Sequence, residues 1–95
     1  MSYYFIARIQ ILNKQEYQKY LDKAESVFNK FNGKYLSVDN NTKVLEGHWD
    51  CTRTVLIEFA SKKDFEKWYY SPEYQEILKF RLESADCNSA LIKGL

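Results

Sequence analysis

One arginine of this sequence falls among apolar side chains rather than on a polar surface. The stretch from Ser71 to Ala85 has helical spacing, and its apolar arc consists of Tyr74, Ile77, Leu78, Leu82 and Ala85. At 100° per residue, Arg81 lies inside this arc. An unpaired guanidinium taken out of water costs several kcal/mol. We therefore expect Arg81 to meet an internal carboxylate, to bind an anion or to extend its head group to solvent.

Two glutamates are candidate partners for this arginine. Glu58 sits in an otherwise apolar strand and Glu46 precedes the bend at Gly47, so either carboxylate could pair with Arg81 or with Arg8. A closed ion pair would fix the packing of the helix and leave no charge free for a ligand. In the alternative, Arg81 holds the carboxylate of a small molecule through two parallel hydrogen bonds. The sequence leaves both alternatives open.

Residues with hydroxyl groups lie just before and within the first turn of the helix that carries Arg81. In the string Trp68-Tyr69-Tyr70-Ser71-Pro72-Glu73-Tyr74, the plain interpretation is a helix break with an N-cap, followed by aromatic core residues. The functional interpretation is that Tyr69, Ser71 and Tyr74 direct hydroxyls into a cavity with Trp68 and Arg81 at its floor. Tyr74 and Arg81 are seven residues apart and therefore share a helix face. A tyrosine hydroxyl there could stabilise a developing oxyanion.

A second group, Glu46-Gly47-His48-Trp49, combines a bend with polar and aromatic side chains. His48 is the only side chain of this group with an ordinary pKa near neutrality, so it is the candidate for proton transfer. Trp49 can form the wall of a pocket, and Glu46 can lie on its rim. The alternative for His48 is an exposed loop residue with no role.

Six segments must position these residues. Alternating apolar residues predict strands from Tyr3 to Leu12, from Lys34 to Val38 with a continuation from Lys43 to Gly47, from Arg53 to Ala60, and from about Ser89 to Lys93. Helices are expected after the N-cap residues Asn13 and Ser61, the second interrupted at Ser71-Pro72 where Ser71 is a new N-cap, and Gly33 is expected to end the first helix. The order β-α-β-β-α-β predicts a ferredoxin-like α+β fold, with a four-stranded antiparallel sheet and its helices on one face.

Such a sheet leaves its other face uncovered. Here that face carries Tyr4, Ile6 and Leu56, which is too apolar for a surface in water. The same face of a second copy would cover it, and twofold symmetry is the commonest arrangement of oligomers. We therefore expect a homodimer.

The composition excludes several classes of protein. The 95 residues, with a net charge of +1, fit one domain over 1–95 and disfavour nucleic-acid binding. No apolar run reaches the roughly 20 residues of a membrane span, and no signal peptide is recognisable, so we expect a cytoplasmic protein with Cys51 and Cys87 as free thiols. One histidine and two scattered cysteines predict no metal site. Without a glycine-rich phosphate loop, we expect no cofactor.

Several strings together resemble a known family. They are the opening strand, Gly33, Val44-Leu45-Glu46-Gly47-His48-Trp49, Val55-Leu56-Ile57-Glu58-Phe59, the Trp68-to-Tyr74 string and Arg81. Over essentially the whole chain they are similar to the domain-of-unknown-function 1330 family of the dimeric α+β barrel superfamily. The resemblance implies a fold and a dimer rather than a reaction. Superfamily relatives include cofactor-free monooxygenases, muconolactone isomerase, haem-dependent peroxidases and small-ligand sensors, so fold alone does not assign function.

The functional hypothesis is a homodimer that binds a small organic acid between sheet and helices. As a cofactor-independent enzyme of isomerase, lyase or monooxygenase type, it would use Tyr69, Tyr74 and His48 to move protons. The expected binding residues are Arg81, Ser71, Trp49, Glu46 and Trp68. The alternative is a non-catalytic ligand-binding or structural dimer. An RNA-recognition module is disfavoured, because the strand from Arg53 to Ala60 lacks the basic, glycine and aromatic pattern of that module.

Overall fold

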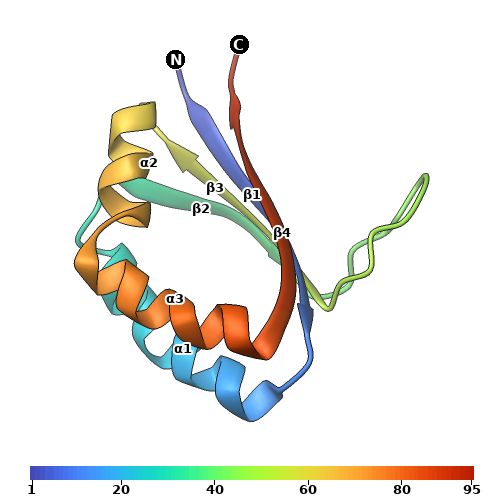
Figure 1. The fold of residues 1–95 in the computed structure, drawn as a ribbon. Coiled ribbons are helices and arrows are strands. Elements are labelled where there is room, and N and C mark those ends of the chain that lie inside the picture. The colour runs from blue at the N-terminus through green and yellow to red at the C-terminus, as the bar shows by residue number, and fades with distance from the viewer.

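Four strands and three helices make up the structure, a computed structural model that describes residues 1–95 (Figure 1). In chain order they are β1 (Tyr3–Ile11), α1 (Lys14–Phe28), β2 (Gly33–Asp39), β3 (Arg53–Phe59), α2 (Lys62–Tyr69), α3 (Pro72–Ser84) and β4 (Ala85–Lys93). The order is β-α-β-β-α-β with the second helical segment divided in two. This confirms the predicted α+β ferredoxin-like fold, including the break before Pro72.

The strands form one antiparallel sheet in the order β2-β3-β1-β4. In the central strand β1, Phe5 lies opposite Ile57 of β3 and opposite Leu91 of β4. All three helices cover the same face of the sheet (Figure 1). Because side chains alternate along a strand, Phe5, Ala7 and Ile9 face the helices and are buried. The core therefore lies between this face and the helices.

Helix starts follow the capping residues expected from the sequence. The Asn13 side chain accepts a hydrogen bond from the Glu16 N–H at 3.1 Å, and the Ser71 hydroxyl accepts one from the Tyr74 N–H at the same distance. Each cap satisfies one of the N–H groups that a helix leaves unpaired at its start. Pro72 occupies the first position of α3. These local signals fix where α1 and α3 begin.

The expectation that Gly33 ends the first helix is wrong. Helix α1 ends at Phe28 with Asn29 as its cap, and Gly33 opens β2 instead. A β-carbon on Gly33 would lie 2.6 Å from ring atoms of both Phe28 and Phe59. The glycine is therefore required where β2 crosses two aromatic rings of the core.

The segment from Lys43 to Gly47 is not a strand, contrary to expectation. Residues 40–52 form a loop without regular structure that projects from the sheet (Figure 1), and no strand lies beside them for pairing. Within this loop, Leu45 is 81% exposed and Gly47 adopts a left-handed φ of 75°.

The last strand is longer than its composition suggests. Strand β4 begins at Ala85, directly after α3 and four residues before the expected start. Its polar first half pairs with the end of β1, where Gln10 lies opposite Asp86 and Ile11 opposite Ala85. Pairing with a central strand therefore overrides the weak local strand preference of these residues.

Candidate functional site

Arg81 is buried without a protein partner. Its residue is 2% exposed, its side chain makes no hydrogen bond, and no carboxylate oxygen lies within 4.0 Å of its nitrogens. Glu58 lies on the helix-free face, near the Tyr4 hydroxyl at 3.4 Å, and Glu46 lies on the projecting loop. The expected internal ion pair is therefore absent, and the guanidinium does not extend to solvent.

Tyr20 connects Arg81 to Tyr74. The Arg81 guanidinium carbon lies 5.8 Å from the centre of the Tyr20 ring, in cation–π range. The Tyr20 hydroxyl lies 2.8 Å from the Tyr74 hydroxyl in a buried hydrogen bond. Tyr74 and Arg81, two turns apart on α3, therefore meet at the same α1 residue. The ring attraction offsets only part of the desolvation of a guanidinium.

The two hydrogen-bonded tyrosines remain protonated at neutral pH. Burial raises the pKa of Tyr74 to about 12, although Arg81 and the Tyr20 hydrogen bond act in the opposite direction. Burial also raises the pKa of Tyr20 well above its usual value. For Arg81, burial lowers the pKa, but the charges that Tyr74 and Tyr20 acquire at high pH outweigh it and raise the pKa overall. At neutral pH the guanidinium is charged, as arginine is in proteins generally. Each hydroxyl carries one proton, and one of these protons forms the hydrogen bond between the two tyrosines. The other O–H remains a hydrogen-bond donor near the positive charge of Arg81.

A cavity of about 30 Å³ lies between the sheet and the side chains of Tyr20 and Arg81, and Tyr74 is not among the residues that line it. Its walls are helix-facing residues of β1 and β3, together with Tyr17, Tyr20, Leu21, Ala24, Tyr35, Trp68 and Arg81; no acidic side chain contributes. Three buried side-chain nitrogens of the chain have no hydrogen-bond partner: Nε of Arg53, Nε1 of Trp68 and Nε of Arg81. All three belong to residues that line this cavity, and all three are donors. The lining of the cavity therefore includes all three residues with unpaired buried donors and no carboxylate.

Trp68, Ser71 and Tyr69 occupy different environments around this cavity. Trp68 is 1% exposed and lines it. The Ser71 hydroxyl donates to the Trp68 carbonyl at 2.8 Å and caps α3, so backbone groups use both of its roles. Tyr69 packs its ring on Phe65 at 5.3 Å and on Phe5 at 6.1 Å. Of these three, only Trp68 lines the Arg81 cavity.

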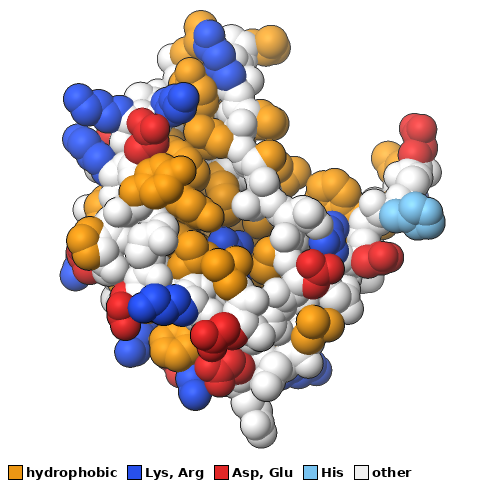
Figure 2. All heavy atoms as spheres, viewed as in Figure 1, with side chains coloured by type: hydrophobic (Ala, Val, Ile, Leu, Met, Phe, Trp, Pro, Cys, Tyr) orange, Lys and Arg blue, Asp and Glu red, His pale blue; other side chains and the backbone are white.

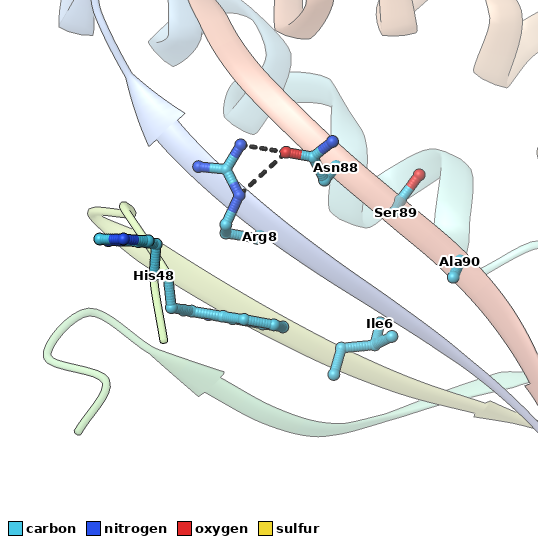
Figure 3. A pocket seen from close by; sticks show the side chains of 7 residues that line it. Ile6, Arg8, His48, Asn88, Ser89 and Ala90 are labelled. Carbon is cyan, nitrogen blue, oxygen red and sulfur yellow. Dashed lines mark hydrogen bonds between the residues drawn. The ribbon is translucent and has the colours of Figure 1, made fainter. Parts of the chain in front are cut away.

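The loop residues expected at the same site lie elsewhere. Figure 3 shows His48 in a separate pocket of about 360 Å³, where β1 and β4 contribute Ile6 and Ala90 on the helix-free face. Trp49 lines the same pocket. Glu46 lies on the projecting loop and lines another surface pocket together with Trp49. The structure therefore does not bring His48, Trp49 and Glu46 to Arg81, because the sheet lies between them.

The arginine of this second pocket is fully engaged by protein groups. The Arg8 Nε donates to the Asn88 side-chain oxygen at 3.0 Å (Figure 3), and a second guanidinium nitrogen lies 3.6 Å from an Asp86 carboxylate oxygen. The Asp50 carbonyl accepts a further hydrogen bond from Arg8. Arg8 thus has the partners that Arg81 lacks, and it fixes the base of the projecting loop.

Among the cavity residues with a polar side-chain group, sequence reasoning missed Tyr17, Tyr20, Tyr35 and Arg53. The alternation along β3 carries the signal for Arg53, since it shares a parity with the buried Val55 and Ile57. The spacing of Tyr17 and Tyr20 carries another, because residues three apart lie on one face of a helix. Neither signal by itself distinguishes a cavity wall from a packed core.

Metal-ligand clusters and membrane-spanning helices have no counterpart in the structure. No three His, Cys, Asp or Glu side chains are grouped as metal ligands would be. The longest helix, α1, has 15 residues, short of the roughly 20 apolar residues of a span, and no bilayer-crossing helix is present.

Known structures share this fold at low sequence identity. RPA0582, a protein of unknown function from Rhodopseudomonas palustris, matches with a TM-score of 0.80 and 19% identity, over 99% of this chain and 82% of that one. SnoaB, a cofactor-independent oxygenase from Streptomyces nogalater, matches with a TM-score of 0.71 and 12% identity, over 99% and 93%. A dimeric ferredoxin-like protein of unknown function from Jannaschia sp. CCS1 gives 0.73 and 8%, over 99% and 100%. At these identities the similarity shows the fold alone.

Comparison by sequence gives a more specific result. No curated protein matches the chain. Residues 2–95, however, match the family described as Domain of unknown function (DUF1330), which confirms the family resemblance noted from the sequence. The chain belongs to the DUF1330 family.

Proposed function

We propose that this protein binds a small organic acid in the cavity between sheet and helices, with Arg81 holding the acid group. The observation that carries the proposal is that all three residues with an unpartnered buried donor line one cavity, and that no acidic side chain lines it. Buried polar groups are hydrogen-bonded in the great majority of proteins, so three unpaired donors at one place call for an acceptor. An anion would supply acceptors and neutralise the guanidinium.

The shape of the site accommodates the acid group and the organic part separately. The cavity at Arg81 is about the size of a water molecule. It shares Leu21, Ala24 and Tyr35 with a groove of about 470 Å³ between α1 and β2, within the size range of ligand pockets. In the proposed complex the acid group enters the cavity, and the carbon skeleton lies along this groove.

Turnover of the bound acid is the second candidate function. A neutral Tyr20–Tyr74 pair beside a cation can protonate or stabilise an oxyanion that develops on a ligand, and this needs no cofactor. Among the other residues expected to move protons, Tyr69 borders the cluster by ring packing, and His48 belongs to the helix-free face. Recovery of a bound acid unchanged after long incubation would favour binding alone. A converted product would favour catalysis.

A thermal-shift screen tests the proposal. Wild type and Arg81→Met would be heated with small carboxylic acids and with the uncharged amides of the same acids. An acid at 100 times its Kd stabilises by about 2.7 kcal/mol, which raises Tm by about 10 °C or more for a domain of this size. We expect this rise for acids, not for amides, and only in the wild type. Lys79→Met, which removes an exposed positive charge from the same helix, should keep the response. Equal shifts in wild type and Arg81→Met would refute the assignment.

We also propose that the protein is a homodimer through the helix-free face of the sheet. This face carries Tyr4, Ile6 and Leu56, with Ile92 51% exposed beside them, and Figure 2 shows hydrophobic side chains along this side and on the projecting loop. Neighbouring apolar side chains that stay partly exposed on one sheet face support an interaction surface there. Structural neighbours of this fold are described as dimeric.

The mass of the particle in solution tests this arrangement. Ile6→Lys places a charge at the centre of the helix-free face and should give a monomer by light scattering. Leu82→Lys makes the same kind of change at an exposed position of α3 and should leave the dimer intact. Circular dichroism would establish that both variants fold. A dimeric, folded Ile6→Lys would contradict the arrangement.

A cytoplasmic location belongs to the same proposal. Cys51 and Cys87 are both free thiols, a state that a reducing compartment maintains. Fractionation of cells that produce the protein would test the location, and recovery outside the cytoplasm would overturn it.

A further inference from the structure

The cavity contains a second unpaired arginine, Arg53, at its outer end. Arg53 opens β3 on the helix-facing side and lies opposite Ile9 in the sheet. Its Nε is buried without a hydrogen-bond partner, and no carboxylate lies within 4.0 Å of its guanidinium. No protein group therefore neutralises this charge.

The two arginines face the same compartment. Both line the cavity, and Tyr17 lies within the electrostatic reach of both, since each lowers the pKa that burial raises. Two like charges in an apolar enclosure repel more strongly than they would in water. A ligand with one negative group would leave one guanidinium unpaired, whereas a ligand with two would satisfy both.

The arginines differ in depth. Arg81 is 2% exposed and lines only the cavity, which is about the size of a water molecule. Arg53 borders the cavity and also two surface grooves of about 470 and 410 Å³. Leu21 and Ala24 line both the cavity and the larger groove, so their apolar side chains are available to contact a short hydrocarbon spacer between two acid groups.

From these positions, which rest on the proposed function of the cavity, we propose that the ligand is a small dicarboxylic acid. Arg81 binds the inner carboxylate and Arg53 the outer one. Glu25, an exposed residue that also lines the groove, has no carboxylate oxygen within 4.0 Å of the Arg53 guanidinium and so does not pair with it. Arg53 is thus the residue that distinguishes dianionic from monoanionic ligands.

Calorimetric titration with matched ligands tests this inference. The probes are the straight-chain dicarboxylates from succinate to adipate and the monoamide of each, which keeps length and shape but removes one charge. The proteins are wild type, Arg53→Met, Arg81→Met and the surface control Lys79→Met. For the best-fitting chain length, wild type and Lys79→Met should bind the diacid about 10- to 100-fold more tightly than its monoamide, as expected for one charge-assisted pair.

Each variant has a distinct expected result. Arg53→Met should bind diacid and monoamide equally, at the affinity of the wild type for the monoamide. Arg81→Met should lose both. If wild type binds both probes with equal affinity, or folded Arg53→Met still prefers the diacid, the role of Arg53 is refuted while acid binding at Arg81 stands. If wild type binds no probe of either kind, and no other small acid, the proposed function fails together with this inference.

Discussion

Replacing Arg81 by methionine should stabilise the protein when no ligand is bound. A buried guanidinium loses several kcal/mol of hydration, and the Tyr20 ring at 5.8 Å returns at most about 2 kcal/mol of this. Apolar side chains of similar volume that replace buried charged groups commonly raise stability by about 1–4 kcal/mol. We expect Arg81→Met to fall in that range, because no protein carboxylate loses its partner.

Urea denaturation of ligand-free protein measures this effect. Both proteins would be unfolded, refolded in buffer without organic acids and compared at one protein concentration, since dimerisation also contributes to stability. A gain of 1 kcal/mol corresponds to a rise in Tm of about 4–8 °C for a domain of this size. Arg8→Met is the contrasting variant, because Arg8 has partners in Asn88 and Asp86, and it should not stabilise. A loss of about 3–5 kcal/mol in Arg81→Met, as for a broken buried pair, would refute the reasoning.

Three further predictions follow from residues near the site. Gly33→Ala should lower the free energy of unfolding by about 1–3 kcal/mol, because the new methyl group would overlap the rings of Phe28 and Phe59; an unchanged urea midpoint would contradict this close approach. Ser71→Ala should lower it by about 1 kcal/mol through loss of the α3 cap, and acid binding measured in the same preparation should be unchanged if the hydroxyl is structural. Above pH 10 the unfolded chain loses the tyrosine proton before folded Tyr74 does. Stability should therefore fall by about 3 kcal/mol as the pH rises from 10 through 12, and a Tyr74→Phe variant should lose less. A pH series of denaturation curves with tyrosinate absorbance checks this, and a flat profile would exclude it.

Local signals made much of the fold predictable. The caps at Asn13 and Ser71 act within three residues, and the alternation in β1 arises from one strand, so neither needs knowledge of distant contacts. The role of Gly33 was missed because it depends on two rings that folding brings together. The strand predicted from Lys43 to Gly47 was wrong for a related reason. A local sequence pattern leads to a strand only where another strand is available for pairing.

For the site too, local patterns predicted some positions, and the rest depended on contacts that form only on folding. Helical periodicity correctly placed Arg81 inside the core. The alternation along β3 puts Arg53 on the same face as the buried Val55 and Glu58 on the other face. Applied consistently, it would have excluded the ion pair between Arg81 and Glu58. No periodicity describes the path of the loop that carries His48, so its separation from Arg81 required the folded structure.

Arg81 lines a cavity that no acidic side chain of the protein lines, and we propose that a ligand supplies the acid group. A crystal structure of the purified protein, soaked with a dicarboxylate or its monoamide, tests it most directly. We expect a ligand carboxylate bound to the Arg81 guanidinium next to the Tyr20–Tyr74 pair, with Trp68 and Tyr17 around the carboxylate. A carboxylate of the protein or of its partner copy paired with Arg81, and the soaked acid absent, would contradict it.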